Sequence, residues 1–94
     1  MAGYFILHTK WHTLDHLREY QEGARKTLQE AGAEPVVYDT NTEVVEGESV
    51  FPATVIIKFE SLEVAKAWYN SPGYQAVLGL RLASSDGVAR FAGT

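Results

Sequence analysis

The stretch AWYNSPGYQAVLGLR, residues 67–81, contains two helical patterns separated by residues that stop a helix. A residue that precedes a proline avoids the α-helical region, so the first helix should end at about Asn70. Ser71 is a good N-cap and Pro72 is a favoured first helical residue, so a second helix should begin there. The stretch therefore predicts a joint at which the chain turns from one helix into another.

The second of these helices brings a charged residue onto an apolar face. Residues at i, i+3, i+4 and i+7 share that face, and here they are Tyr74, Val77, Leu78 and Arg81. A guanidinium in this position either extends to the rim of the core or is paired with an acid inside it. In either case Arg81 is a candidate functional residue.

Outward from this stretch, hydrophobic periodicity predicts the remaining elements. In chain order they are a strand over 3–9, a helix from a cap at Thr13 to a stop at Gly32, a strand over 35–47 with a bulge, bend or hairpin-like kink at 40–41, a strand over 53–60, a helix capped by Ser61, and a final strand over 87–93. This β-α-β-β-α(α)-β order predicts an α+β, ferredoxin-like fold with a four-stranded antiparallel sheet and helices on one face. A length of 94 residues fits one such domain, spanning 1–94.

The first predicted strand is apolar on both of its faces. Tyr4, Ile6 and His8 point one way, and Phe5, Leu7 and Thr9 point the other. In the predicted fold the helices cover only one face of the sheet, so something else must cover the second. The sequence therefore predicts a homodimer in which another copy of the chain covers that face.

Composition and charge exclude several classes of protein. The net charge is −4, the pI is about 5.2 and no basic cluster occurs, so neither nucleic acid nor an anionic membrane surface is an expected partner. No apolar run is long enough to span a membrane, and the N-terminal residues have the pattern of a strand, so a cytoplasmic location is expected. The absence of cysteine excludes thiol catalysis and disulfide bonds.

Four stretches resemble the small bacterial family DUF1330, within the dimeric α/β-barrel superfamily: GYFILH at 3–8, VVEG at 44–47, VIIKFES at 55–61 and AWYNSPGYQAVLGLR at 67–81. The last is the most specific, because the family combines an Ala-Trp-Tyr helix, a Ser-Pro joint, a Tyr-Gln pair and an arginine. These correspond here to Ala67-Trp68-Tyr69, Ser71-Pro72, Tyr74-Gln75 and Arg81. Gly73 stands where an acidic residue would be expected, which weakens the helix start but not the joint.

The resemblance covers nearly the whole chain and implies a homodimer whose two sheets face each other. It does not imply a reaction. Relatives across the superfamily include cofactor-independent monooxygenases, lactone isomerases and dye-decolourising haem proteins, and the fold alone does not choose among them.

Seven residues are candidates for a site. The catalytic candidates are His8 and Arg81, and the substrate-binding candidates are Tyr38, Glu46, Trp68, Ser71 and Tyr74. His8 is either an acid–base residue or a hydrogen-bonded structural histidine. Arg81 either forms a buried ion pair with Glu46 or holds a carboxylate or enolate of a substrate.

No metal or cofactor is expected from the sequence. His8, His12 and His16 are spaced by four, but they fall on a strand, a connection and a helix start, so they do not share a helical face. No phosphate-binding loop, dinucleotide fingerprint or catalytic triad is present.

Two classes of function remain open. One is an enzyme without a cofactor, an isomerase or monooxygenase acting on a small apolar or aromatic acid in a pocket between sheet and helices. The other is a non-catalytic dimeric binding or structural module. A cavity of a few hundred Å³ with His8 or Arg81 in its wall would favour the first, and a filled core would favour the second.

Overall fold

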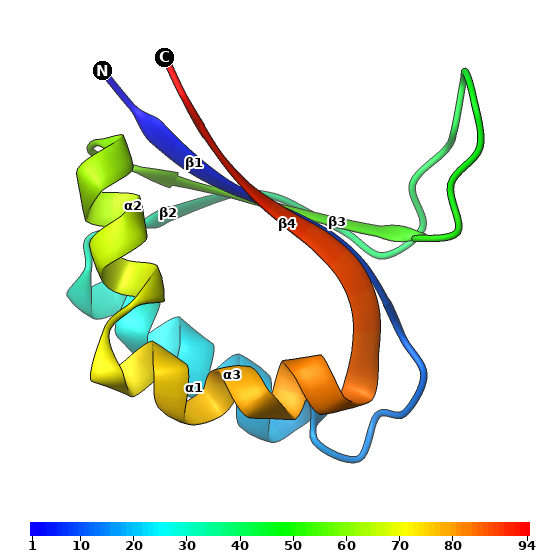
Figure 1. The fold of residues 1–94 in the computed structure, drawn as a ribbon, viewed down its shortest axis with the longest axis horizontal. Coiled ribbons are helices and arrows are strands. Elements are labelled where there is room, and N and C mark those ends of the chain that lie inside the picture. The colour runs from blue at the N-terminus through cyan, green and yellow to red at the C-terminus, as the bar shows by residue number, and fades with distance from the viewer.

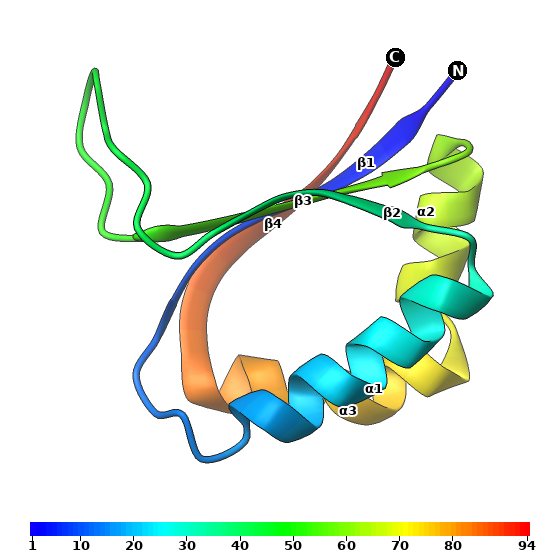
Figure 2. The same cartoon turned by 180° about the vertical axis from the view of Figure 1, so that it is seen from behind.

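The structure, a computed structural model, describes residues 1–94 as four strands and three helices (Figures 1 and 2). The elements are β1 (Gly3–Trp11), α1 (Leu17–Glu30), β2 (Glu34–Asp39), β3 (Ala53–Phe59), α2 (Leu62–Tyr69), α3 (Pro72–Ser84) and β4 (Ser85–Gly93). The strands form one sheet in the order β2-β3-β1-β4, and every neighbouring pair is antiparallel. This confirms the predicted ferredoxin-like fold.

All three helices lie on one side of the sheet, but they do not contact it equally (Figure 1). α2 packs directly on β1, β3 and β4, whereas α1 packs mainly on α3. Figure 2 shows α1 and α3 side by side, with the sheet above them. No helix in the structure has both the length and the apolar character needed to cross a membrane.

The joint between α2 and α3 forms as the sequence predicts. The Ser71 hydroxyl accepts a hydrogen bond from the backbone N–H of Tyr74 at 3.3 Å and donates one to the carbonyl of Trp68 at 2.7 Å. Pro72 is the first residue of α3. By bonding to both helix ends, Ser71 fixes the turn that places the Trp68 and Tyr74 rings against each other, with centroids 4.1 Å apart.

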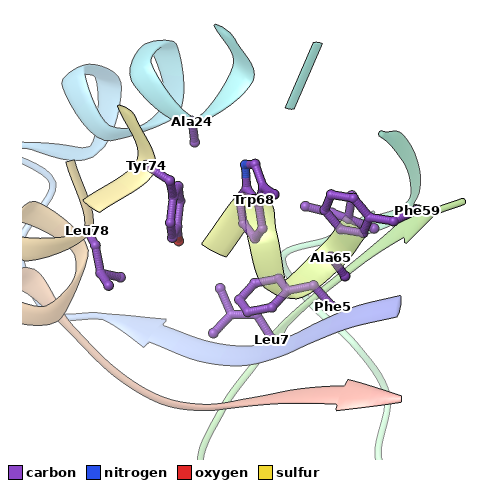
Figure 3. Close-up of a cluster of buried hydrophobic side chains, with 9 residues drawn as sticks. Phe5, Leu7, Ala24, Phe59, Ala65, Trp68, Tyr74 and Leu78 are labelled. Carbon is purple, nitrogen blue, oxygen red and sulfur yellow. The ribbon is translucent and has the colours of Figure 1, made fainter. Parts of the chain in front are cut away.

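The core between the sheet and the helices is rich in aromatic rings (Figure 3). Trp68 lies between Tyr74 and Phe59 and also packs edge-on against Phe5 of β1. Its indole N–H donates to the hydroxyl of Thr27 at 3.0 Å. This hydrogen bond satisfies a polar group that would otherwise be buried without a partner.

The start of α1 differs from the prediction. The helix begins at Leu17 and not directly after Thr13, and its N-cap, His16, makes no side-chain capping hydrogen bond. The Thr13 hydroxyl instead accepts from the N–H of Asp15 at 3.4 Å, which stabilises a local turn before the helix. The C-terminal end is as predicted, because Gly32 takes a positive φ of 67° directly after the last turn.

The predicted long strand over 35–47 is wrong in its second half. β2 ends at Asp39, whose carboxylate accepts from the N–H of Asn41 at 2.9 Å and turns the chain. Residues 40–52 then form a loop closed by the N–H of Thr42, which donates to the carbonyl of Pro52 at 2.8 Å. The bulge also lies elsewhere, between Pro35 and Val37. The apolar pattern of 44–45 favoured a strand, but the structure gives these residues no neighbouring strand.

The face of the sheet opposite the helices has no covering element (Figures 1 and 2). The strand register places on it the residues Tyr4, Ile6 and His8 of β1, Thr54, Ile56 and Lys58 of β3, and Val88 and Arg90 of β4. The loop over 40–52 projects from the sheet on this same side (Figure 1). The open face is therefore partly apolar and is bordered by an arm of the chain.

Candidate functional site

A cavity of about 760 Å³ lies between α1 and the helix-facing side of β1, β2 and β3. α2 packs directly on the sheet, whereas α1 packs mainly on α3 and not on the sheet. Space therefore remains between α1 and the strands. Most of its wall is apolar and includes Phe5, Leu7, Ala24, Leu28, Ile57 and Trp68. A cavity of this size and lining fits a small, mainly apolar molecule.

The polar residues of the wall include Tyr20 of α1 and Arg81 of α3. The other polar residues that line the cavity are Thr9, Lys10, Gln21, Arg25, Tyr38, Asp39 and Thr40. The Tyr20 hydroxyl is hydrogen-bonded to that of Tyr74 at 2.6 Å, and Tyr74 lies behind the wall with none of its surface exposed. Arg81 is only 4% exposed, and its Nε is buried without a hydrogen-bond partner. A buried guanidinium with a free donor thus stands at the edge of an apolar cavity.

The surroundings of Tyr20 and Arg81 determine the protonation state of each side chain. Burial raises the pKa of Tyr20, interaction with Tyr74 raises it further, and the smaller opposing effect of Arg81 leaves it above the ordinary tyrosine value. For Arg81, burial lowers the pKa, but the Tyr74 and Tyr20 hydroxyls together more than offset this and raise it. At neutral pH the guanidinium is therefore charged and Tyr20 keeps its proton.

A hydrogen bond joins α1 to β2 at the edge of the cavity. Gln21 Nε2 donates to the hydroxyl of Tyr38 at 2.8 Å, and both residues line the cavity. Tyr38 is 63% exposed, so this contact lies where the cavity meets solvent. Gln21 and Tyr38 thus form part of the boundary of the cavity on the side of the edge strand.

The structure separates the seven candidate residues into groups. Tyr38, Trp68 and Arg81 line the cavity, while Tyr74 lies directly behind it. Ser71 does not line the cavity, because its hydroxyl is used in the joint between α2 and α3.

The other two candidates, His8 and Glu46, line a second hollow of about 720 Å³ on the open face, between the sheet and the 40–52 loop. There Nδ1 of His8 is hydrogen-bonded to the hydroxyl of Thr54 at 3.0 Å. No group of three or more His, Asp or Glu side chains in the structure is arranged to hold a metal ion.

The predicted ion pair between Glu46 and Arg81 is wrong. Arg81 lines the cavity on the helix side of the sheet, and Glu46 is exposed in the loop on the opposite side. The prediction depended on a strand through residues 44–47, which would have carried Glu46 along the sheet. That strand ends at Asp39, so Glu46 lies in the loop. The side chains that raise the pKa of Arg81 are those of Tyr74 and Tyr20 and not a carboxylate.

Sequence reasoning missed Tyr20 and Gln21 as lining residues. Tyr20 lies within the helix predicted between Thr13 and Gly32, at a spacing of three from Leu17 and four from Ala24, which is typical of a core-facing helical stripe. The sequence signal that could have identified Tyr20 was the presence of Tyr20 and Arg81 on the core-facing stripes of two different helices. Two polar groups on core-facing stripes are expected to meet, since each needs a partner inside.

Comparison with solved structures shows the same fold in proteins of very different sequence. A protein of unknown function from Rhodopseudomonas palustris has a TM-score of 0.82 at 11% identity, over 99% of this chain and 82% of that one. A dimeric ferredoxin-like protein of unknown function from Jannaschia sp. CCS1 has a TM-score of 0.74 at 15% identity, over 96% and 98%. SnoaB, a cofactor-independent oxygenase from Streptomyces nogalater, has a TM-score of 0.60 at 12% identity, over 99% and 92%.

At these identities the three structures show the fold alone. No curated protein sequence matches the chain significantly. The family pattern of DUF1330, a domain of unknown function, matches residues 2–92, which is nearly all of the sequence and includes both the helix joint and Arg81. The chain therefore belongs to the DUF1330 family.

Proposed function

We propose that the protein binds the anion of a small apolar or aromatic acid in the cavity between α1 and the sheet, with Arg81 as the anion-binding residue. The observation that carries this proposal is the buried Nε of Arg81, which has no partner within the chain. A buried charge normally has a counter-charge, and no acid of this chain supplies one to Arg81. A ligand anion would complete the site.

The tyrosine hydroxyls do not replace that anion. Tyr20 stays protonated because its pKa is raised, so its hydroxyl offers Arg81 a dipole and not a negative charge. An ionised ligand would make a charge-assisted hydrogen bond with the Arg81 guanidinium, which is about twice as strong as a neutral one. The apolar wall formed by Phe5, Leu7 and Ile57 would meanwhile bury the body of the ligand.

Thermal-shift measurements with 2-naphthoate and phenylpyruvate test the proposal. A ligand that binds only the folded state at 100 times its Kd stabilises it by about 2.7 kcal/mol. We expect the wild type to be stabilised by at least one of these acids and Arg81→Met to lose that stabilisation. Arg18→Met is the matched control, because Arg18 is exposed on α1 and does not line the cavity. Equal stabilisation of Arg81→Met and wild type would contradict the proposal.

The proposal includes assembly as a homodimer through the open face of the sheet. Support comes from the dimeric ferredoxin-like neighbours, such as the protein from Jannaschia sp. CCS1, and from the apolar residues Ile6 and Ile56 on that face. The cavity lies on the other side of the sheet, so each copy would keep a complete cavity of its own.

Catalysis on the bound acid, as a cofactor-independent isomerase or monooxygenase, is the second candidate function. It is favoured by the fold shared with the cofactor-independent oxygenase SnoaB together with the polar residues at one part of an apolar cavity. Incubation of the wild type and Arg81→Met with a bound acid, followed by mass spectrometry, separates the two functions. A product formed only by the wild type would support an enzyme, whereas tight binding without conversion would support a binding module.

A further inference from the structure

We infer that the acid bound beside Arg81 carries a second negative group about 10 Å from the first, and that Arg25 of α1 binds this second group where the cavity meets solvent. This inference rests on the proposed function, since it specifies which class of acid the cavity takes. It assigns the cavity an elongated dianion with an apolar body, and it gives Arg25 a role in specificity.

The charge of the cavity wall is opposite in sign to that of the whole chain. Three of the eight Lys and Arg residues line the cavity, namely Lys10, Arg25 and Arg81, but only one of the twelve Asp and Glu residues does, Asp39. The wall therefore has a net charge of +2 in a chain whose net charge is −4. A wall of one sign attracts ligands of the other, and a dianion would neutralise this wall whereas a monoanion would leave it positive.

The cations of the wall lie at different depths. Arg81 is only 4% exposed, whereas Lys10 and Arg25 are exposed residues that also line the cavity. The carboxylate of Asp39 accepts a hydrogen bond from the N–H of Asn41 at 2.9 Å, so the one acid of the wall is used in the turn after β2. Arg25 therefore offers a second anion-binding group near solvent, while Arg81 offers the first one inside.

The geometry of α1 sets the distance between the two arginines. Tyr20, whose hydroxyl interacts with the Arg81 guanidinium, precedes Arg25 by five residues on this helix. The two side chains therefore leave the helix about 7.5 Å apart along its axis and about 140° apart around it. Gln21, one turn before Arg25, donates to the hydroxyl of Tyr38, so Arg25 is on the flank of α1 that faces β2. The two cationic groups are thus on the order of 10 Å apart.

The surface between the two ends is apolar. Leu17, Ala24 and Leu28 line it from α1, and Leu7 and Ile57 line it from the sheet. The cavity volume of about 760 Å³ lies in the range that buries most of a drug-sized ligand. A ligand with an acid at each end and an apolar body between them would match the charges and the walls together.

Isothermal titration calorimetry at low ionic strength, with biphenyl-4,4′-dicarboxylate and biphenyl-4-carboxylate, tests the inference, because the two acids differ only in the second carboxylate. The two equivalent ends of the diacid alone give it an advantage of about twofold. We expect the wild type to bind the diacid roughly 4- to 10-fold more tightly, since the second carboxylate adds one partly exposed charge pair. Arg25→Met should reduce this preference to about twofold and leave binding of the monoacid unchanged. Arg25→Glu should lower it further, because like charges repel.

Lys26→Glu is the matched control, because Lys26 is exposed on the same helix and does not line the cavity. It should keep the wild-type preference, whereas Arg81→Met should weaken binding of both acids. A wild-type preference of no more than about twofold, or one that survives in Arg25→Met, would overturn the inference and leave the proposed function standing, provided that binding depends on Arg81. Binding of neither acid in an Arg81-dependent way would overturn both.

Discussion

Tyr20 is held in a part of the protein that disfavours its ionisation. Burial, and then the neighbouring Tyr74, keep its pKa above the ordinary tyrosine value of about 10, despite the opposing effect of Arg81. The folded state therefore retains a proton that the unfolded chain releases at alkaline pH. The stability linked to this proton is fully present below about pH 10 and is lost as the pH rises further.

We predict that Tyr20→Phe removes part of this alkaline sensitivity. Urea unfolding at a series of pH values across the tyrosine range should show a steeper loss of stability for the wild type than for the variant. Tyr38→Phe is the control, since Tyr38 is exposed and should leave the wild-type slope unchanged. If the stability of the wild type and of Tyr20→Phe changed in parallel with pH, Tyr20 would ionise equally easily in the folded and unfolded states, which would contradict the prediction.

The buried hydroxyl of Thr27 makes two hydrogen bonds. Its hydroxyl accepts from the indole N–H of Trp68 at 3.0 Å and donates to the carbonyl of Ala24 at 2.8 Å. We predict that Thr27→Val, which keeps the shape, destabilises the protein by about 1–3 kcal/mol because the indole N–H loses its acceptor. Urea unfolding measures the loss, and Thr40→Val at an exposed position should change the stability by less than about 0.5 kcal/mol. Equal values for the two variants would contradict the prediction.

Among the elements, α1 and α3 approach each other at a glycine. A Cβ added to Gly23 would meet Cγ1 of Val77 at 2.5 Å, whereas a Cβ on Gly79 of α3 would meet nothing within 4 Å. The absent side chain at Gly23 thus allows the close packing of two helices that bear Tyr20 and Arg81.

We predict opposite effects for two alanine substitutions. Gly23→Ala should destabilise the protein by about 1–3 kcal/mol through overpacking. Gly79→Ala should stabilise it by about 0.5–1 kcal/mol, because alanine favours a helix more than glycine does. Thermal unfolding of both variants is the measurement. A gain in stability for Gly23→Ala would mean that Val77 moves aside at little cost.

Most of the elements could be predicted because local patterns determine them. The joint at Ser71-Pro72 depends on capping and backbone restriction within four residues, and the sheet follows from strands whose alternation is clear. The loop over 40–52 was not predictable in the same way. Its valines favour a strand, but a strand also needs a neighbour, and the sequence alone does not show that none is present.

The site was predictable only in part, for a related reason. Arg81 and Trp68 belong to one local motif, and both line the cavity. The contact between Tyr20 and Tyr74 joins residues 54 positions apart, and nothing in local periodicity sets that distance. The pairing of Glu46 with Arg81 failed because it depended on a strand through residues 44–47, and the sequence does not show on which side of the sheet each residue lies.

At the scale of the whole molecule, one sheet separates two surfaces of different character. The helix side encloses the cavity with Arg81, and the opposite side presents an open face with Ile6 and Ile56. The arm over 40–52 leaves the sheet on the open side, and its Val45 is 84% exposed. Because β1 contributes to both sides through alternate residues, the proposed assembly on one side and the proposed ligand binding on the other would use different residues of the same strand.

We predict that Ile6→Asp prevents dimer formation. Ile6 is on β1, in the middle of the sheet, and pairs with Ile56 of β3 and Arg90 of β4, so a second copy covering this face would bury it. A carboxylate there would be desolvated without a partner in the dimer but not in the separated chain. Light scattering should give twice the chain mass of 10.4 kDa for the wild type and a lower mass or a poorly folded chain for the variant.

Leu82→Asp separates this effect from a general loss of apolar surface. Leu82 is 61% exposed on α3, on the helix side of the molecule, so its replacement should leave the dimer intact. An acid that stabilises the wild type should stabilise Leu82→Asp equally, because Leu82 does not line the cavity. A wild-type mass of 10.4 kDa at micromolar concentration, or dissociation caused by Leu82→Asp and not by Ile6→Asp, would show that the open face is not the interface.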